Sequence, residues 1–193
     1  MLKIYKFSTI KKKEIDTLTQ YILVEGGILK NTNYKIITKK WLKKFASNNK
    51  VIEKNYFQTN DGKRFYADNK HVVLDYGLKE KKIANWLSNV FGCSVCINPR
   101  INYPEGIKTS DYIFKNEYWD LKAINGNSKQ VLYHAIYDKK DQSKNFIFDL
   151  TNSTLSLKEG INQIKIIYSR TDMTFVDKII IKKNQYFYVF KRK

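Results

Sequence analysis

The sequence predicts an α/β domain with a mixed sheet, and three observations point to this fold class. Two segments with helical apolar spacing, residues 77–92 and 156–170, alternate with short apolar runs that are typical of strands. One of these runs, residues 145–150 (NFIFDL), is apolar almost throughout, as expected for a central strand. The chain has 193 residues, of which 42% are hydrophobic, and this is enough to bury one sizeable core.

The elements after residue 76 follow in a clear order. The helix at 77–92 is expected to end at Gly92, and a short strand follows at 94–98. Two strands flank the turn at Lys115 and Asn116, and a turn-rich start then leads into a helix within 125–142. The strand at 145–150, the helix at 156–170 and a hairpin at 175–193 complete the chain. The predicted order is therefore α-β-β-β-α-β, followed by α-β-β.

Residues 1–70 give weaker signals, and we predict a smaller basic N-terminal region there, separate from an α/β domain at residues 71–193. Residues 2–7 are compatible with a strand, and residues 14–27 have helical spacing that stops at two glycines. A second helix is expected within 38–49, with Thr38 as its cap. Residues 55–68 are typical of a hairpin around Asp61 and Gly62.

Charge is the strongest feature of the composition. The chain has 36 Lys and Arg residues against 18 Asp and Glu, a formal net charge of +18. Such a balance favours a polyanionic partner, nucleic acid or an anionic membrane, although a solubilising Lys-rich surface is the alternative. The N-terminus has no apolar signal region, and no run approaches the roughly 20 apolar residues that span a bilayer. We therefore expect no membrane partner and a cytoplasmic site of action.

The cysteines and histidines do not predict a metal site of the zinc-finger type. Cys93 and Cys96 form a C-x-x-C pair, but no second pair accompanies it. The only histidines, His71 and His134, are far apart in sequence. Two cysteines are also too few for a disulfide framework, and free thiols suit a reducing cytosol.

Residues 108–124 (KTSDYIFKNEYWDLKAI) place charged side chains in a segment that is otherwise mostly apolar and aromatic. Asp120 and Lys122 share one face of a strand, and Asp111 opens the neighbouring strand, so the two carboxylates can approach each other. Two close carboxylates repel unless a cation lies between them, and Mg²⁺ prefers oxygen ligands. Lys122 would orient a water or offset charge on a phosphate. The alternative is an ordinary surface Asp–Lys pair.

Three further residues are candidates for the same site. Glu80 lies at the end of the apolar stripe of its helix. Two explanations of this carboxylate are equally good: it is a third metal ligand, or it is a first-turn Glu that interacts favourably with the helix N-terminus. Gln142 is expected near the end of the next helix, where it would orient a ligand or would simply be a polar residue at a helix end. His134 is held as a reserve general base.

Candidate nucleic-acid contacts lie mainly in the N-terminal region. The helix within 38–49 combines four lysines with Trp41, which is a stacking candidate but is more often a core residue at such a position. Lys108 and His134 are the remaining candidates. The four lysines are Lys39, Lys40, Lys43 and Lys44.

The residues Glu80, Asp111, Asp120-x-Lys122 and Gln142, in this order of elements, resemble the PD-(D/E)xK nuclease superfamily. Ser110 stands where that superfamily usually has Pro, and Asp120 is the allowed acidic residue of the D/E-x-K element. Three segments, 79–92, 104–124 and 139–153, look more narrowly like the C-terminal tRNase domain of CdiA contact-dependent inhibition toxins. The likeness covers roughly residues 75–193, and none is found for residues 1–70.

The resemblance implies a metal-dependent endonuclease with a restriction-endonuclease-like core that cleaves RNA, with tRNA as the favoured substrate. Asp111, Asp120 and Glu80 would hold the ion, Mg²⁺ first and Mn²⁺ or Zn²⁺ otherwise. Lys122 would position the water, and Gln142 would complete the catalytic set. An acidic immunity protein is an implied partner, and delivery within a larger secreted or phage protein is an implied route.

Three other readings of the same residues stay open. A DNA endonuclease of this superfamily would use the same ion chemistry. An RNase without a metal would use His134 with Lys and Tyr side chains. A basic nucleic-acid-binding module without activity would show salt-dependent binding and no turnover.

Overall fold

A computed structural model describes residues 32–42, 49–54, 56–58, 64–66, 76–98, 100–101 and 105–193. The chain divides into two compact units, Met1–Thr32 and Asn33–Lys193. The strand expected at 2–7 and the helix expected at 14–27 lie outside the described residues. The fold below is that of the second unit.

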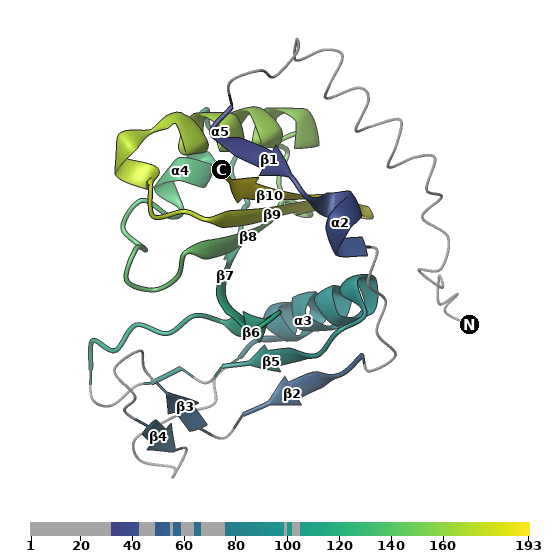
Figure 1. The fold of residues 1–193 in the computed structure, drawn as a ribbon, viewed down its shortest axis with the longest axis vertical. Coiled ribbons are helices and arrows are strands. Elements are labelled where there is room, and N and C mark those ends of the chain that lie inside the picture. The colour runs from purple at the N-terminus through teal and green to yellow at the C-terminus, as the bar shows by residue number, and fades with distance from the viewer. Residues whose placement is uncertain are drawn as a thin grey trace. The chain divides into compact units, whose positions relative to one another are not determined.

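The second unit is built on an eight-stranded mixed sheet in the order β1-β10-β9-β8-β7-β6-β5-β2 (Figure 1). The β7–β8, β8–β9 and β2–β5 pairs are parallel and the other pairs are antiparallel. The strands are β1 (Tyr34–Ile36), β2 (Val51–Glu53), β5 (Val95–Ile97), β6 (Tyr112–Phe114), β7 (Glu117–Ala123), β8 (Asn145–Asp149), β9 (Lys178–Lys183) and β10 (Tyr186–Arg192). The mixed α/β fold predicted from the sequence is confirmed.

Strand β8 forms the centre of the core. All five of its residues are buried, and it pairs with β7 on one side and β9 on the other. A strand covered on both faces needs apolar residues at successive positions, which is why Phe146, Ile147 and Phe148 follow one another. The prediction of a central strand here is confirmed.

Helices α3 (Leu78–Phe91) and α5 (Leu157–Ser169) cover opposite faces of the sheet. The ring of Trp86 in α3 lies 5.3 Å from that of Phe187, which is opposite Lys182 in the ladder. In α5, Gly160 lies against Ile181, the neighbour of Lys182, which points to the other face. A Cβ at position 160 would lie 2.6 Å from Ile181 Cδ1, so any larger residue there would have to displace the Ile181 side chain.

The turn at Lys115 and Asn116 and the helix end at Gly92 agree with the predictions from the sequence. Lys115 and Asn116 have φ angles of 52° and 60°, which form the tight turn between β6 and β7. Gly92 has a φ of 60° and ends α3 in the left-handed conformation. Helix α5 begins at Ser156, whose Oγ accepts a hydrogen bond from the Glu159 N–H at 3.1 Å. Strands β3 (Tyr56–Gln58) and β4 (Arg64–Tyr66) form the predicted hairpin.

The helix predicted within 125–142 is much shorter than expected. Helix α4 spans only Val131–His134, and turns lead from it to β8. Beyond His134 the N–H groups of Ile136, Lys139 and Gln142 donate to carbonyls three residues earlier in the chain, which is the pattern of separate turns and not of an α-helix. The helical spacing that had suggested one long helix was therefore misleading.

Segments before residue 71 contribute to the same sheet. Strand β1 pairs with β10, and β2 pairs with β5. Between them, helix α2 (Thr38–Leu42) begins at Thr38, whose Oγ1 accepts a hydrogen bond from the Val189 N–H at 2.9 Å. The two strands have three residues each and no pattern of their own, so only their pairing partners define them. In the described parts of the chain, no helix is long and apolar enough to cross a bilayer.

Candidate active site

Asp111 and Asp120 lie opposite each other on neighbouring strands. Strands β6 and β7 are antiparallel, with Tyr112 opposite Trp119, and the same register one residue further along pairs Asp111 with Asp120. Asp111 Oδ2 accepts a hydrogen bond from the Leu121 N–H at 2.6 Å. The tight turn at residues 115 and 116 fixes this register and so brings the two carboxylates together.

Lys122 forms a buried ion pair with Asp120. Its Nζ lies 2.5 Å from Asp120 Oδ2, and the side chains are 19% and 1% exposed. A carboxylate oxygen has two lone pairs, so Asp120 Oδ2 can accept a further ligand beside Lys122. The pair therefore lies inside the domain and differs from an ordinary surface Asp–Lys pair, which is weak and solvent-exposed.

Burial raises the pKa of both carboxyls, and repulsion from Asp120 raises that of Asp111 further. Desolvation and the neighbouring Asp120 raise the pKa of Asp111 to about 7, against the opposing effects of the Leu121 N–H and Lys122. Desolvation also raises the pKa of Asp120, while Lys122 and a hydrogen bond with Asp111 act in the opposite direction. Lys122 alone therefore does not offset the effect of burial on these two carboxyl groups.

The carboxylate pair fits a hard divalent cation. Mg²⁺ commonly binds through one or two carboxylates and fills its other positions with water and substrate phosphate oxygens. Burial and the neighbouring Asp120 raise the pKa of Asp111, and a cation bound between the two carboxylates would offset both effects. A bound ion would have to share Asp120 with Lys122.

Glu80 is engaged elsewhere, although it is close enough to Asp111 to contribute to its raised pKa. One carboxylate oxygen accepts the Gly77 N–H at the start of α3, and the other lies 2.6 Å from Arg100 Nη2. Its backbone carbonyl accepts the Tyr112 hydroxyl at 2.9 Å. Glu80 thus makes the contacts expected of a first-turn Glu at a helix N-terminus, which was the alternative to metal binding. Within the described ranges, no three His, Cys, Asp or Glu side chains are grouped to hold a metal ion.

Gln142 lies in a turn before β8 and not on a helix. Its Nε2 donates to the Thr109 carbonyl at 2.8 Å, two residues before Asp111. Gln142 therefore holds the segment that enters β6. Nearby, Lys108 Nζ lies 3.5 Å from Asp141 Oδ2, and both side chains are more than half exposed.

The lysines of the N-terminal region divide into two groups. Lys39 and Lys40 are exposed on α2, whereas Lys43 and Lys44 lie outside the described residues. Trp41 packs inward, with its ring centroid 5.5 Å from that of Phe91 and within 6 Å of the rings of Phe114 and Trp119. Trp41 is half-buried, and its ring is engaged with these aromatic side chains.

His134 is exposed at the end of α4. Its ring centroid lies 5.2 Å from that of Tyr133 and 6.2 Å from that of Tyr137, whose side chain is 55% exposed. The Tyr133 ring also lies against the Arg170 guanidinium, whose Cζ is 4.0 Å from the ring centroid. No contact places His134 against Asp111 or Asp120 in the described part of the chain.

Two residues near the carboxylate pair were missed by sequence reasoning. Lys139 is close enough to lower the pKa of Asp120, and its place in a Lys-Lys run before Gln142 was the available signal. Asn98 donates from Nδ2 to the Ser110 carbonyl and hydroxyl at 3.2 Å, while its buried Oδ1 has no hydrogen-bond partner. Nothing in the sequence marked Asn98, because only the β5–β6 pairing places it beside Ser110.

Comparisons with known proteins found one family model and one solved structure that are similar to parts of the chain. The solved CdiA-CT/CdiI toxin and immunity complex from Burkholderia pseudomallei contains a chain that is 21% identical, with a TM-score of 0.47; the match covers 59% of this chain and 83% of that one. No curated protein matches the chain in sequence. A family model described as "Contact-dependent growth inhibition CdiA C-terminal domain" matches residues 108–187. This match to the family of CdiA C-terminal domains of contact-dependent growth inhibition includes Asp111, Asp120 and Lys122.

Proposed function

We propose that this chain is the toxic part of a contact-dependent inhibition system and acts as a metal-dependent endonuclease on RNA, with tRNA as its favoured substrate. The observation that carries the proposal is the buried Asp111–Asp120 pair with Lys122 at its side. The match of residues 108–187 to CdiA C-terminal domains supports the toxin role and delivery as part of a larger protein.

The order of elements and the D-x-K spacing support placement in the PD-(D/E)xK superfamily. Helix α3 is followed by β5, β6, β7, α4 and β8, which is the α-β-β-β-α-β order of the expected core. Asp111 precedes β6, and Asp120 and Lys122 lie on β7, where that superfamily carries its acidic residues and lysine.

The residues of the site would have different roles in the reaction. Asp111 and Asp120 would hold a divalent ion, Mg²⁺ first and Mn²⁺ or Zn²⁺ otherwise. When bound, such an ion polarises a phosphate oxygen and lowers the pKa of a bound water. Lys122 holds Asp120 in place and offers an N–H donor to the water or to the phosphate. Glu80 and Gln142 act around this centre, since Gln142 fixes Thr109 and Glu80 fixes the start of α3.

The basic surface suits a polyanionic substrate. A formal charge of +18 favours association with nucleic acid, and the exposed Lys39, Lys40 and Lys108 are the described candidates for phosphate contacts. We infer that residues 1–70 contribute substrate binding while residues 71–193 carry the chemistry. The same charge would attract an acidic immunity protein that covers the site.

An in vitro digest tests the proposal. Total tRNA, single-stranded DNA and duplex DNA are incubated with the full chain and Mg²⁺, Mn²⁺ or Zn²⁺, and parallel reactions contain EDTA or the Asp120→Asn variant. We expect tRNA cleavage that EDTA abolishes and that Asp120→Asn lowers on the order of 10³-fold or more. Preferential cleavage of DNA would support a DNA endonuclease instead. Equal cleavage by both proteins, or cleavage unaffected by EDTA, would contradict the proposed mechanism.

A further inference from the structure

A cavity of about 420 Å³ adjoins the segment that carries Asp111. Its walls come from Ser110 before β6, from the start of β7, from the turn at 140–145 and from Asp177 before β9. Its volume falls within the range of about 300–1,000 Å³ that is usual for small-molecule sites. The cavity therefore has room for one nucleotide beside the candidate active site.

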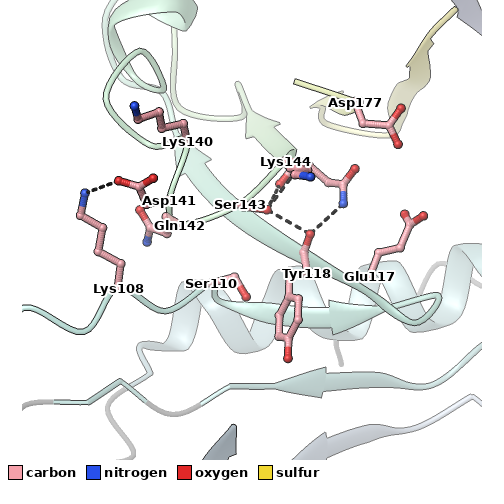
Figure 2. A pocket seen from close by; sticks show the side chains of 11 residues that line it. Lys108, Ser110, Glu117, Tyr118, Lys140, Asp141, Gln142, Ser143, Lys144 and Asp177 are labelled. Atoms are coloured by element: carbon pink, nitrogen blue, oxygen red, sulfur yellow. Dashed lines mark hydrogen bonds and ion pairs between the residues drawn. The ribbon is translucent and has the colours of Figure 1, made fainter. Parts of the chain in front are cut away.

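The two ends of the cavity differ in charge. Figure 2 shows Lys108 and Lys140 at one end and the carboxylates of Glu117 and Asp177 at the other. Lys140 is exposed, and the Lys108–Asp141 contact is solvent-exposed and therefore weak. These ammonium groups are available to an incoming phosphate.

The acidic end carries hydrogen-bond acceptors that are not satisfied. Glu117 Oε1 lies 2.7 Å from Lys178 Nζ, but its Oε2 is buried without a hydrogen-bond partner. Asn145 Nδ2 donates to the Tyr118 carbonyl at 2.9 Å, and its Oδ1, on a residue only 7% exposed, is likewise without a partner. Unpaired buried acceptors are costly, so these two oxygens favour a ligand that brings N–H donors.

The side chain of Glu117 can turn toward such a ligand. It is 36% exposed as a whole, and rotation about its last side-chain bond is soft. Binding of such a ligand would require the carboxylate to turn until one oxygen faces the cavity. Lys178 is also held by Asp177 Oδ2 at 2.6 Å, so it keeps one carboxylate partner during this rotation.

A nucleotide combines the required groups, with a phosphate for the lysines and base N–H donors for the acceptors. Guanine presents two adjacent donors, N1–H and the N2 amino group, on its Watson–Crick edge, whereas uracil presents one N–H between two acceptor oxygens. We propose that this cavity is a guanine-binding pocket that selects the nucleotide next to the cleaved bond. Its role in selection rests on the proposed function, whereas guanine binding can be measured without it.

Binding of mononucleotides to the full-length Asp120→Asn variant in EDTA tests the pocket without cleavage. Isothermal titration compares GMP with AMP, CMP, UMP and IMP, which lacks the N2 amino group. We expect GMP to bind most tightly, with IMP weaker by about 10-fold through the loss of one donor. Equal affinity for all five nucleotides, equal affinity for GMP and IMP, or binding of none of them would overturn the proposal.

Protein variants sharpen the test. Glu117→Gln should weaken GMP binding by about 10-fold because it replaces a charged acceptor by a neutral amide. Asp138→Asn removes one exposed carboxylate outside the cavity lining and should leave GMP binding unchanged. Since Glu117 also pairs with Lys178, thermal unfolding of each variant is recorded, and the comparison of GMP with IMP stands even if Glu117→Gln does not fold.

The two proposals fail in different ways. Cleavage of tRNA without nucleotide discrimination would reject the pocket and keep the nuclease. Selective GMP binding by a chain that cleaves no nucleic acid would keep guanine binding and reject the nuclease together with selection at a cleaved bond. Mapping of the cut sites in tRNA should show guanine beside the cut for the wild type and a weaker preference for Glu117→Gln.

Discussion

Asp111 and Asp120 face each other across the β6–β7 hairpin, one residue beyond the last pair of its ladder. Burial, together with the neighbouring Asp120, raises the pKa of Asp111 to about 7. The hairpin thus holds two carboxylates where their mutual repulsion destabilises the fold unless a proton, a cation or Lys122 compensates. The predictions below follow from this arrangement and from its surroundings.

Removal of one carboxylate should stabilise the metal-free protein at high pH. Because the folded pKa of Asp111 is raised above its usual value of 3.8, its effect favours folding at low pH and is lost as the pH rises through about 7. Asp111→Asn keeps an acceptor for the Leu121 N–H, so in EDTA at pH 8 it should raise stability on the order of 1–3 kcal/mol.

Chemical denaturation at pH 8 and pH 5.5 checks this sign. The advantage of Asp111→Asn over the wild type should shrink at pH 5.5, where Asp111 is mostly protonated. Addition of Mg²⁺ at pH 8 should stabilise the wild type more than the variant. A variant that is less stable than the wild type at both pH values would show that the carboxylate is not repelled in the folded state.

Replacement of Lys122 should separate catalysis from substrate binding. Lys122→Met removes the N–H donor beside Asp120 and should lower the rate of tRNA cleavage on the order of 10²–10⁴-fold, the usual range for loss of such a group. Affinity for tRNA, measured in EDTA, should change little. Lys129→Met, at an exposed position before α4, serves as the control and should cleave like the wild type.

Glu80 should matter more for the fold than for metal binding. Both of its oxygens are engaged, by the Gly77 N–H and by Arg100, so Glu80→Gln keeps an acceptor at the helix end but loses the ion pair. We expect a loss of stability of about 1 kcal/mol or less and a fall in cleavage of less than about 10-fold.

The matched control for Glu80 is Glu159, the acidic capping residue of α5. Glu159→Gln should give a stability loss similar to that of Glu80→Gln and no change in cleavage. A fall in cleavage for Glu80→Gln as large as that for Asp120→Asn would instead place Glu80 among the metal ligands, after a rearrangement around Arg100.

The exposed lysines of α2 should contribute to RNA binding through charge alone. The double variant Lys39→Gln, Lys40→Gln should lower the salt dependence of tRNA affinity by about 1–2 units of slope on a log–log plot. The double variant Lys79→Gln, Lys82→Gln, which removes two exposed charges from α3, controls for net charge. Equal slopes for the two double variants would show that α2 has no special place in binding.

Trp41 should stabilise the fold and not bind bases. Its ring packs against Phe91, Phe114 and Trp119, so Trp41→Ala should cost about 3–5 kcal/mol of stability. Tyr137→Ala, at a side chain that is 55% exposed, should cost less than about 0.5 kcal/mol. Urea denaturation measures both, and a stable Trp41→Ala that loses RNA binding would restore its role as a stacking surface.

The sequence alone determined those features that depend on neighbours along the chain. Gly92 ends α3, Lys115 and Asn116 turn the β6–β7 hairpin, and the run at 145–150 is a buried strand, because turn, cap and burial signals are local. The alternation of strand residues also predicted that Asp120 and Lys122 share a face, and their 2.5 Å contact agrees with it.

The tertiary structure decided what depends on partners distant in sequence. Strands β1 and β2 have no pattern of their own and exist through pairing with β10 and β5. Helix α4 ends at His134, and the chain beyond it continues in turns, in which the Ile136 N–H donates to the Tyr133 carbonyl. Packing of separate segments also brings Glu80 to Arg100 and places Glu117 and Asn145 around one cavity. No short window of sequence contains both members of either pair.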